Sequence, residues 1–346
     1  MNFFEDFTVG QRFEHATPRT LTAGDASLYI ALTGARQPVP CSLPLARAMG
    51  YPGVPLDDLL VFHVAFGKTV ADISYNAIAN LGYADVRFTA PVYAGDTIEC
   101  ESEVIGLRAN SNGKSGIVYV RSRAMNQDGQ EVLTWARWVM VARRKEAPPA
   151  GYAVVPPLPG HVEPGAVAVP GFLDASRLDP RATGGTRLWD DYAPGETIDH
   201  PAGATLEEAE HMMATRLYQN PARLHFDAFR EAKGPFKRRL IYGGHMISLC
   251  RALSHDGLEN AFAIAAIHGG THANPMFAGD TLYCRHVVLS RDALPGRSDV
   301  ALLRLRMLGA KNLELAALPA LERGAKHESV VLDLDYSVLI PRRQNP

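Results

Sequence analysis

One internal repeat constrains this chain more than any other feature. Residues 3–10 (FFEDFTVG) and residues 188–195 (LWDDYAPG) place aromatic residues, acids and a glycine in the same order, 185 positions apart. A second pair of segments, residues 91–97 (PVYAGDT) and residues 275–281 (PMFAGDT), matches at an offset of 184. Two long matches in the same order indicate a duplication, in which each copy is one structural unit.

The chain of 346 residues suits two domains of about 150 residues each and a connector. We assign residues 1–145 to an N-terminal unit, residues 146–183 to the connector and residues 184–346 to a C-terminal unit. The connector is rich in Pro and Gly, which favours extended backbone and a semi-rigid spacer, with a disordered linker as the alternative. Its valines predict that part of it packs on a surface: Val154, Val155, Val167 and Val169.

Each unit combines one buried helix with several strands. Residues 59–66 (LLVFHVAF) are apolar nearly all round, and residues 245–253 follow a Gly243-Gly244 turn at the equivalent place. A helix that is apolar on most faces is a buried helix. Later segments read as strands, with a hairpin turn at residues 126–129. The pattern predicts an α+β fold of two antiparallel sheets, each wrapped around a long helix, that pair edge to edge into one continuous sheet.

Composition excludes several classes of function. The formal net charge is −2, so the chain lacks the basic surface of a nucleic-acid-binding protein. The sequence starts without a signal-peptide pattern and contains no run of about 18 apolar residues, so we expect a cytoplasmic protein with no membrane partner. The four cysteines are scattered without CxxC spacing, which predicts buried free thiols.

Motifs for cofactors and metals are missing from the sequence. No GxGxxG, Walker or GxSxG pattern occurs, so redox cofactors and serine hydrolysis lack support, and we predict no cofactor. His268 and His272 lie four residues apart, but in a segment that reads as loop and strand, with no acidic or Cys partner nearby. We therefore expect no metal site at these histidines.

A polar loop at residues 218–227 (YQNPARLHFD) is the most informative segment for chemistry. It follows a helix that a capping box at Thr205 and Glu208 should begin. His225 can exchange protons near neutral pH, whereas Asn220 can hold a water or a carbonyl but cannot take a proton. The plain alternative is a loop that connects two helices, with Asp227 as a helix cap.

The repeat favours a functional loop. At an offset of 185 the N-terminal copy has non-reactive residues opposite Asn220, Arg223 and His225. These residues are Ala35, Pro38 and Pro40. A duplicated enzyme with one working site and one degenerate site would show this asymmetry.

The C-terminal copy resembles the MaoC-like (R)-specific enoyl-CoA hydratases. The resemblance is carried by Asn220-Pro221 followed by His225, by the glycine turn at residues 241–244 (IYGG), and by the Pro-x-x-x-Gly-Asp-Thr strand motif of both copies. It covers most of both halves and implies a double hot-dog fold. The whole-chain layout, with ARQPVP at residues 35–40, is most similar to the mesaconyl-CoA hydratase subgroup, also called β-methylmalyl-CoA dehydratase. The resemblance implies a lyase that reversibly adds water to mesaconyl-CoA.

The sequence departs from the family pattern at one position. The family's acidic residue falls at Asn220 when counted back from His225, or at Tyr218 when Asn220-Pro221 is taken as the anchor. Either alignment removes the usual Asp, so His225 must carry most of the proton transfer or an acid must come from elsewhere. Three acids are candidates, each with a plain structural alternative: Asp227, Glu210 and Asp25.

The resemblance implies roles for the remaining residues. His225 is the candidate acid and base, Asn220 positions the water, and the Gly243 N–H at a helix start stabilises the thioester oxyanion. Tyr242 and Gly244 flank that donor in the substrate site, although a tight turn alone also explains the glycines. Arg223 is the candidate partner of a second substrate carboxylate. Three cations before the turn are candidates for the CoA phosphates, and a solvated face is their plain alternative: Lys237, Arg238 and Arg239.

Three other functions stay open at this point. A hot-dog thioesterase would use the same CoA-thioester site, a hydratase could act on a monocarboxylic enoyl-CoA, and a scaffold could bind acyl-CoA without catalysis. The substrate is a CoA thioester in each case. Because a double unit already supplies two paired copies, assembly into a homo-oligomer is optional.

Overall fold

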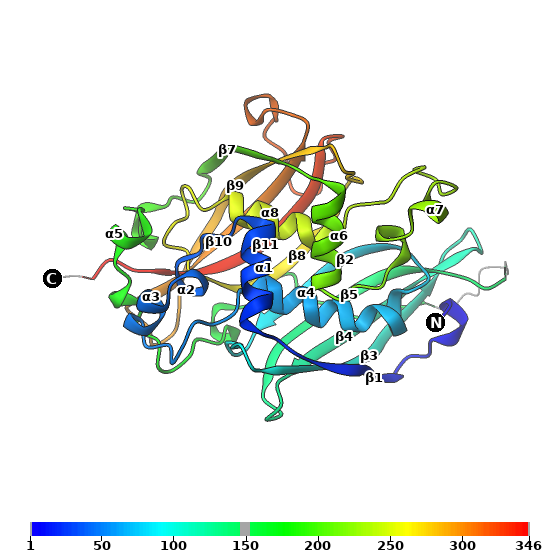
Figure 1. Ribbon diagram of the computed structural model, residues 1–346, viewed down its shortest axis with the longest axis horizontal. Coiled ribbons are helices and arrows are strands. Elements are labelled where there is room, and N and C mark those ends of the chain that lie inside the picture. Colours follow the sequence, from blue (N-terminus) through cyan, green and yellow to red (C-terminus); the bar gives the residue numbers. More distant parts are fainter. Residues whose placement is uncertain (1, 146–152, 345–346) are drawn as a thin grey trace.

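The computed structural model describes residues 2–145 and 153–344. Its two described ends lie at opposite ends of the long axis (Figure 1). Among the described residues, no helix has the length and apolar character needed to cross a membrane.

Both halves follow the same order of elements, a strand and a short helix, then a central helix, then four strands. The N-terminal half consists of β1 (Arg12–Thr20), α1 (Ala23–Thr33), α2 (Pro38–Cys41), α3 (Leu43–Ala48), α4 (Asp58–Thr69), β2 (Ala77–Phe88), β3 (Thr97–Ala109), β4 (Ser115–Met125) and β5 (Glu131–Ala142). The C-terminal half consists of β7 (Thr197–Thr205), α6 (Glu208–Leu217), α7 (Ala228–Glu231), α8 (Gly243–Leu253), β8 (Ala263–Thr271), β9 (Thr281–Ala293), β10 (Val300–Lys311) and β11 (Val330–Pro341). The repeat read from the sequence is thus a repeat of structure.

The two predicted sheets join into one, as expected from edge-to-edge pairing. The strand order is β1-β3-β4-β5-β2-β8-β11-β10-β9-β7. The join is the antiparallel pair β2 and β8, where Ala84 lies opposite Gly269. Because Ala84 and Gly269 are 185 residues apart, each residue faces its own repeat partner, which gives the molecule a pseudo-two-fold axis at this pair. Between the two halves, over the residues that the structure describes, the pairing of β2 with β8 leaves no strand edge open.

The two central helices occupy the core. Every residue of α4 from Leu59 to Thr69 is buried, and α8 is buried from Gly244 to Ala252. The helices α1, α4, α6 and α8 gather on one face of the sheet at its centre (Figure 1). Removing this much apolar surface from water is the main driving force for the packing.

The predicted capping box at Thr205 is wrong. Thr205 is the last residue of β7, and its hydroxyl hydrogen-bonds to that of Thr281 at 2.8 Å. Helix α6 begins at Glu208, after a Glu207 N-cap that makes no side-chain cap hydrogen bond. The N-terminal copy has a capping box at Thr22, two residues after the repeat partner of Thr205, and the Thr22 side chain accepts from the Asp25 N–H.

The connector packs along the molecule over the part that the structure describes, which leaves out its first residues, 146–152. It forms a two-residue strand, β6 (Ala153–Val154), against β3, and a short helix, α5 (Pro180–Thr183). Val167 and Val169 pack on a core cluster as predicted, whereas Val154 and Val155 are exposed. Three of the cysteines are buried free thiols, but Cys41 is exposed, which corrects that prediction.

Candidate active site

A cavity of about 260 Å³ lies between the two halves. The C-terminal half contributes the 222–225 loop, the start of α8 and the segment 272–276. The N-terminal half contributes the end of α4 and parts of β2 and β5. Most of the lining is apolar, with a few polar groups that converge on it, which is the usual construction of a small-molecule site.

His225 lies in this cavity in one defined tautomer. Its Nδ1 is 2.8 Å from the carbonyl oxygen of Leu240. Since a carbonyl can only accept, Nδ1 carries the proton and Nε2 is left with a lone pair for the cavity. Burial lowers the pKa of His225 to about 4, so the ring is neutral at pH 7. A neutral, oriented imidazole of this kind can act as a general base.

The start of α8 brings a hydrogen-bond donor to the same cavity. Gly243 is the first residue of the helix, so its N–H has no acceptor within the helix, and it lines the cavity. A Cβ atom at Gly243 would lie 2.4 Å from the ring of His272. Tyr242 also lines the cavity, and its N–H is held by Nε2 of His211 at 2.8 Å. This bond fixes the direction of the helix start, and glycine is needed because the ring of His272 fills the adjacent space.

Gly244 was predicted to lie in the substrate site, but it does not line the cavity. It is buried within the protein instead. A Cβ atom there would lie 2.5 Å from the ring of Tyr242 and 2.7 Å from that of His63. Gly244 therefore permits the close packing of α8 on α4 and supports the site from behind.

Asn220 and Arg223 are not brought to the cavity. The Asn220 side chain accepts the N–H of Ala222 at 3.0 Å, which closes a turn before the η6 segment (Arg223–His225). The Arg223 guanidinium lies over the ring of Tyr75, 4.5 Å from its centre. Neither residue lines the cavity: the Asn220 side chain forms a turn, and Arg223 lies outside the cavity.

None of the three candidate acids reaches His225. Asp227 caps α7 by accepting from Arg230, and Asp25 caps α1 and pairs with Arg19 at 2.5 Å. Glu210 lies 3.5 Å from His245, one helix away. The described hydrogen-bond partner of the His225 ring is instead a backbone carbonyl, that of Leu240, which orients the ring without adding a charge.

Most of the cavity lining was not among the predicted site residues, and two of these residues, His272 and Arg137, bear on its chemistry. His272 was considered only as a metal ligand, yet it lines the cavity, with its Nε2 at 3.0 Å from the Tyr83 hydroxyl. Its Nδ1 is buried and has no partner among the described residues. Burial lowers the pKa of His272 to about 4. Arg137 reaches the cavity from β5 of the N-terminal half.

A sequence model of the mesaconyl-CoA hydratase family matches residues 1–157. Over 343 residues, 99% of this chain and 97% of the relative, the chain is 52% identical to the β-methylmalyl-CoA dehydratase of Chloroflexus aurantiacus. It is 49% identical over 342 residues to the mesaconyl-CoA hydratase of Cereibacter sphaeroides, covering 98% of both chains.

The chain belongs to the mesaconyl-CoA hydratase family.

Solved structures agree with this membership. A MaoC domain protein dehydratase from Chloroflexus aurantiacus superposes with a TM-score of 0.96 at 52% identity, covering 99% of this chain and 98% of that one. A Mycobacterium tuberculosis protein described as a double hotdog fold superposes with a TM-score of 0.77 at 26% identity, covering 98% of both chains. These matches confirm the predicted double hot-dog fold and the predicted family.

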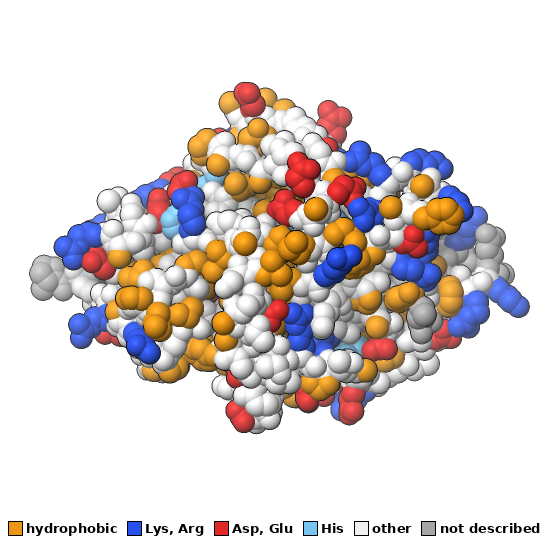
Figure 2. Space-filling model, viewed as in Figure 1, with side chains coloured by type: hydrophobic (Ala, Val, Ile, Leu, Met, Phe, Trp, Pro, Cys, Tyr) orange, Lys and Arg blue, Asp and Glu red, His pale blue; other side chains and the backbone are white. Residues whose placement is uncertain are grey.

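The basic triplet of this family member borders the cavity only in part. Phe236, the residue before the triplet, lines the cavity, and Lys237 and Arg238 are exposed beside it. Arg238 also hydrogen-bonds the carbonyl of Ala278, and Arg239 forms an ion pair with Glu208. Lys and Arg side chains gather around α7 on this face (Figure 2). Lys237 and Arg238 therefore remain the candidates for phosphate contact, while Arg239 is engaged within the protein.

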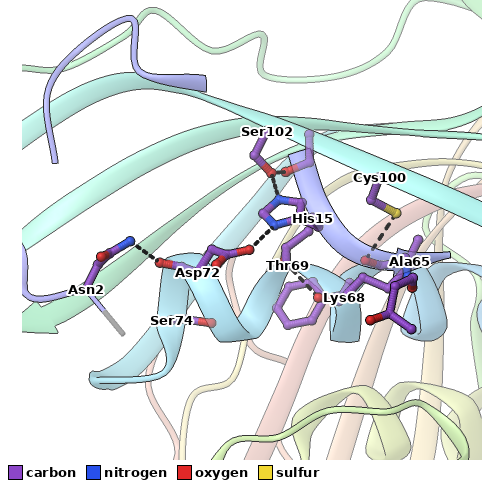
Figure 3. A network of polar contacts seen from close by, with 12 residues as sticks. Asn2, His15, Ala65, Lys68, Thr69, Asp72, Ser74, Cys100 and Ser102 are labelled. Atoms are coloured by element: carbon purple, nitrogen blue, oxygen red, sulfur yellow. Dashed lines mark hydrogen bonds and ion pairs between the residues drawn. The ribbon is translucent and has the colours of Figure 1, made fainter. Parts of the chain in front are cut away.

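Two other histidine clusters lie outside the cavity. His15 bonds Asp72 at 2.7 Å and Ser102 at 2.8 Å, the order of groups in a serine hydrolase (Figure 3). However, Ser102 is buried, is bonded to Ser122 and lines no cavity found among the described residues. In the second cluster His200, Cys284 and His286 lie close together, but their ring nitrogens already bond one another, the Asp256 carbonyl and Tyr336. Both clusters are polar networks that complete the core.

Proposed function

We propose that this protein reversibly adds water to mesaconyl-CoA, giving β-methylmalyl-CoA. The observation that carries the proposal is the joint presence, in one cavity, of a neutral His225 with a free Nε2 and the unpaired N–H of Gly243. Hydration of a conjugated thioester needs a base for the water and a donor for the thioester oxygen. The names of the relatives at 52% and 49% identity support this substrate.

His225 is the proposed base. Its Nε2 takes a proton from water, whose oxygen bonds to C3 while the C2–C3 double-bond electrons move toward the thioester carbonyl. The N–H of Gly243 then donates to the negative oxygen, supported by the positive end of the α8 dipole. The proton that His225 took from water is then delivered to C2, which restores the thioester carbonyl and the neutral imidazole, so one water is added and nothing is oxidised.

The imidazole of His272 is the proposed second proton-transfer group, which passes the proton from His225 on to C2 and is neutral before and after the step. Among the described residues that line the cavity there is no Asp or Glu. Both proton transfers therefore fall to imidazoles, and His272 lies against Gly243, the oxyanion donor. The Tyr83 hydroxyl orients this ring at 3.0 Å, as the Leu240 carbonyl orients that of His225.

The substrate proposal includes a CoA end at the cavity mouth. Lys237 and Arg238 stand beside the cavity-lining Phe236 and are the proposed contacts of the CoA phosphates. A cytoplasmic location is part of the proposal, on the character of the sequence.

The test is the ultraviolet absorbance of the enoyl thioester with purified protein, read together with a free-thiol assay. Loss of the mesaconyl-CoA signal without thiol release is the expected result. Turnover of crotonyl-CoA alone would support hydratase activity but contradict the proposal of a dicarboxylic substrate. Release of CoA would identify a thioesterase instead, a function that the closed-in Ser102 does not support.

A further inference from the structure

Arg137 is a buried cation that faces the cavity with only neutral partners. It is 1% exposed and lines the cavity from β5. Its Nη2 donates to the Thr69 hydroxyl at 2.9 Å, and its Nη1 donates to the Ser74 hydroxyl at 3.3 Å. Its Nε is buried and has no acceptor among the described residues. A buried charge of this kind is costly unless an anion meets it.

The acid that lies in sequence between the two hydroxyl partners, Asp72, is engaged elsewhere. Asp72, in the turn between Thr69 and Ser74, pairs with His15 at 2.7 Å, and Figure 3 shows it directed at that ring. In the described part of the chain, no carboxylate forms an ion pair with Arg137. Burial lowers the pKa of Arg137 to about 10, so the guanidinium still carries its charge at pH 7.

The environment holds the guanidinium ready for a planar anion. Arg137 lies over the ring of Phe66, 4.2 Å from its centre, and Phe66 also lines the cavity. Stacking and the two hydroxyls fix the plane of the guanidinium, and an arginine held in this way matches a carboxylate in bidentate fashion. The cavity therefore offers a carboxylate subsite in addition to the thioester site.

We infer that Arg137 binds the second carboxylate of a dicarboxylic acyl thioester and thereby selects the substrate. The inference rests on the proposed function and assigns a role to the half of the chain that lacks the catalytic loop. In a mesaconyl thioester the free carboxylate is attached to C3, the carbon that receives water. Arg137 and His225 line one cavity, so the anion and the reacting carbon can be held together. This places the carboxylate contact at Arg137 and not at Arg223.

The experiment measures binding of two saturated analogues by calorimetry, so that it does not depend on turnover. 2-Methylsuccinyl-CoA carries the second carboxylate, and 2-methylbutyryl-CoA has a methyl group in its place. The wild-type protein should bind the diacid 10- to 100-fold more tightly, the range of a charge-assisted hydrogen bond. In Arg137→Met this ratio should fall to about 1–3, with the affinity for 2-methylbutyryl-CoA unchanged, and Arg137→Lys should retain part of it.

The controls separate this inference from the proposed function. If Arg137→Met weakens both analogues equally, the residue is structural and the inference fails. If Arg223→Met removes the preference and Arg137→Met does not, the carboxylate belongs to Arg223. A wild-type protein that prefers the diacid but does not hydrate mesaconyl-CoA would reject the proposed reaction and leave the subsite standing.

Discussion

The cavity and its repeat partner differ in what fills them. The working cavity measures about 260 Å³, whereas the equivalent place in the other half measures about 40 Å³. At an offset of 185, Pro40 stands at the place of His225, Asp58 at that of Gly243 and Phe262 at that of Ala77. The same backbone plan therefore gives an open site or a closed one, according to side-chain size and chemistry.

The smaller cavity is filled by its own side chains, and residues of the N-terminal half line the larger cavity instead. The helix start at the smaller cavity carries Asp58, whose carboxylate accepts the N–H of Ile264, so this acid is already engaged within the protein. The N-terminal half supplies the opposite wall of the open cavity, where the Tyr83 hydroxyl contacts His272 and Arg137 is part of the lining. Duplication followed by divergence produces one asymmetric site with parts from both copies.

Removal of the base should have the largest effect. His225→Ala should lower kcat for mesaconyl-CoA hydration by about 10²–10⁴-fold, the usual contribution of general acid–base catalysis. Pro40→Ala, at the matched position of the closed site, should change kcat less than twofold. Steady-state kinetics of both variants measure this difference in kcat. A small loss in His225→Ala would mean that the two sites do not differ in the way their residues imply.

A methyl group at the helix start should come next. Gly243→Ala places a Cβ atom 2.4 Å from the His272 ring, which must then move and weaken its contact with Tyr83. We expect about a 10²-fold fall in kcat/KM, the scale of losing one oxyanion donor. Gly160→Ala is the control, since a Cβ there meets nothing within 4 Å. If Gly243→Ala and Gly160→Ala changed kcat/KM equally, Gly243 would have no specific role in the mechanism.

The sequence predicted the architecture well because its signals were local. The repeat, the apolar helix at residues 59–66 and the hairpin turns each depend on short segments, and all appear in the structure. His225 and Gly243 also follow from local motifs. Arg137 and His272 join the site only through the pairing of β2 with β8 and the packing between halves, which no short segment reports. A lone arginine between Trp135 and Trp138 in an apolar strand was the one available sign.

The buried histidines predict a weaker fold in acid. Burial lowers the pKa of His225 and His272 to about 4 and that of His63 and His211 to about 3. Unfolded histidine binds a proton below about pH 6.5, so unfolding takes up protons in this range. The free energy of unfolding should therefore fall from pH 6.5 toward pH 4, by up to about 1.4 kcal/mol per pH unit for each ring. Urea unfolding at several pH values measures this slope, and a flat profile would contradict it.

Asp58 in the closed site should make the free energy of unfolding fall as the pH rises, the opposite of the histidine effect. This is the smallest of the expected effects. Burial, followed by the nearby Asp57, raises the pKa of Asp58 to about 7. The folded carboxyl therefore keeps a proton that the unfolded one releases above about pH 3.8, and the stability it contributes is lost as the pH rises through 7. Asp58→Asn cannot ionise and its amide oxygen can still accept from Ile264, so its stability relative to the wild type should rise between pH 5 and pH 8. Partial exposure limits the gain to about 1 kcal/mol per pH unit or less.

Urea unfolding of Asp58→Asn at pH 5 and pH 8 measures this difference, with the exposed turn variant Asp128→Asn as the control that should show none. Hydratase activity should stay within twofold of the wild type, because Asp58 lines only the closed site. If the relative stability did not change with pH, the carboxyl would be ionised throughout and the closed site would be wetter than its packing indicates. If the hydratase activity of Asp58→Asn fell tenfold instead, the two sites would be coupled across the β2–β8 pair. The interpretation of one active and one inactive site would then be wrong.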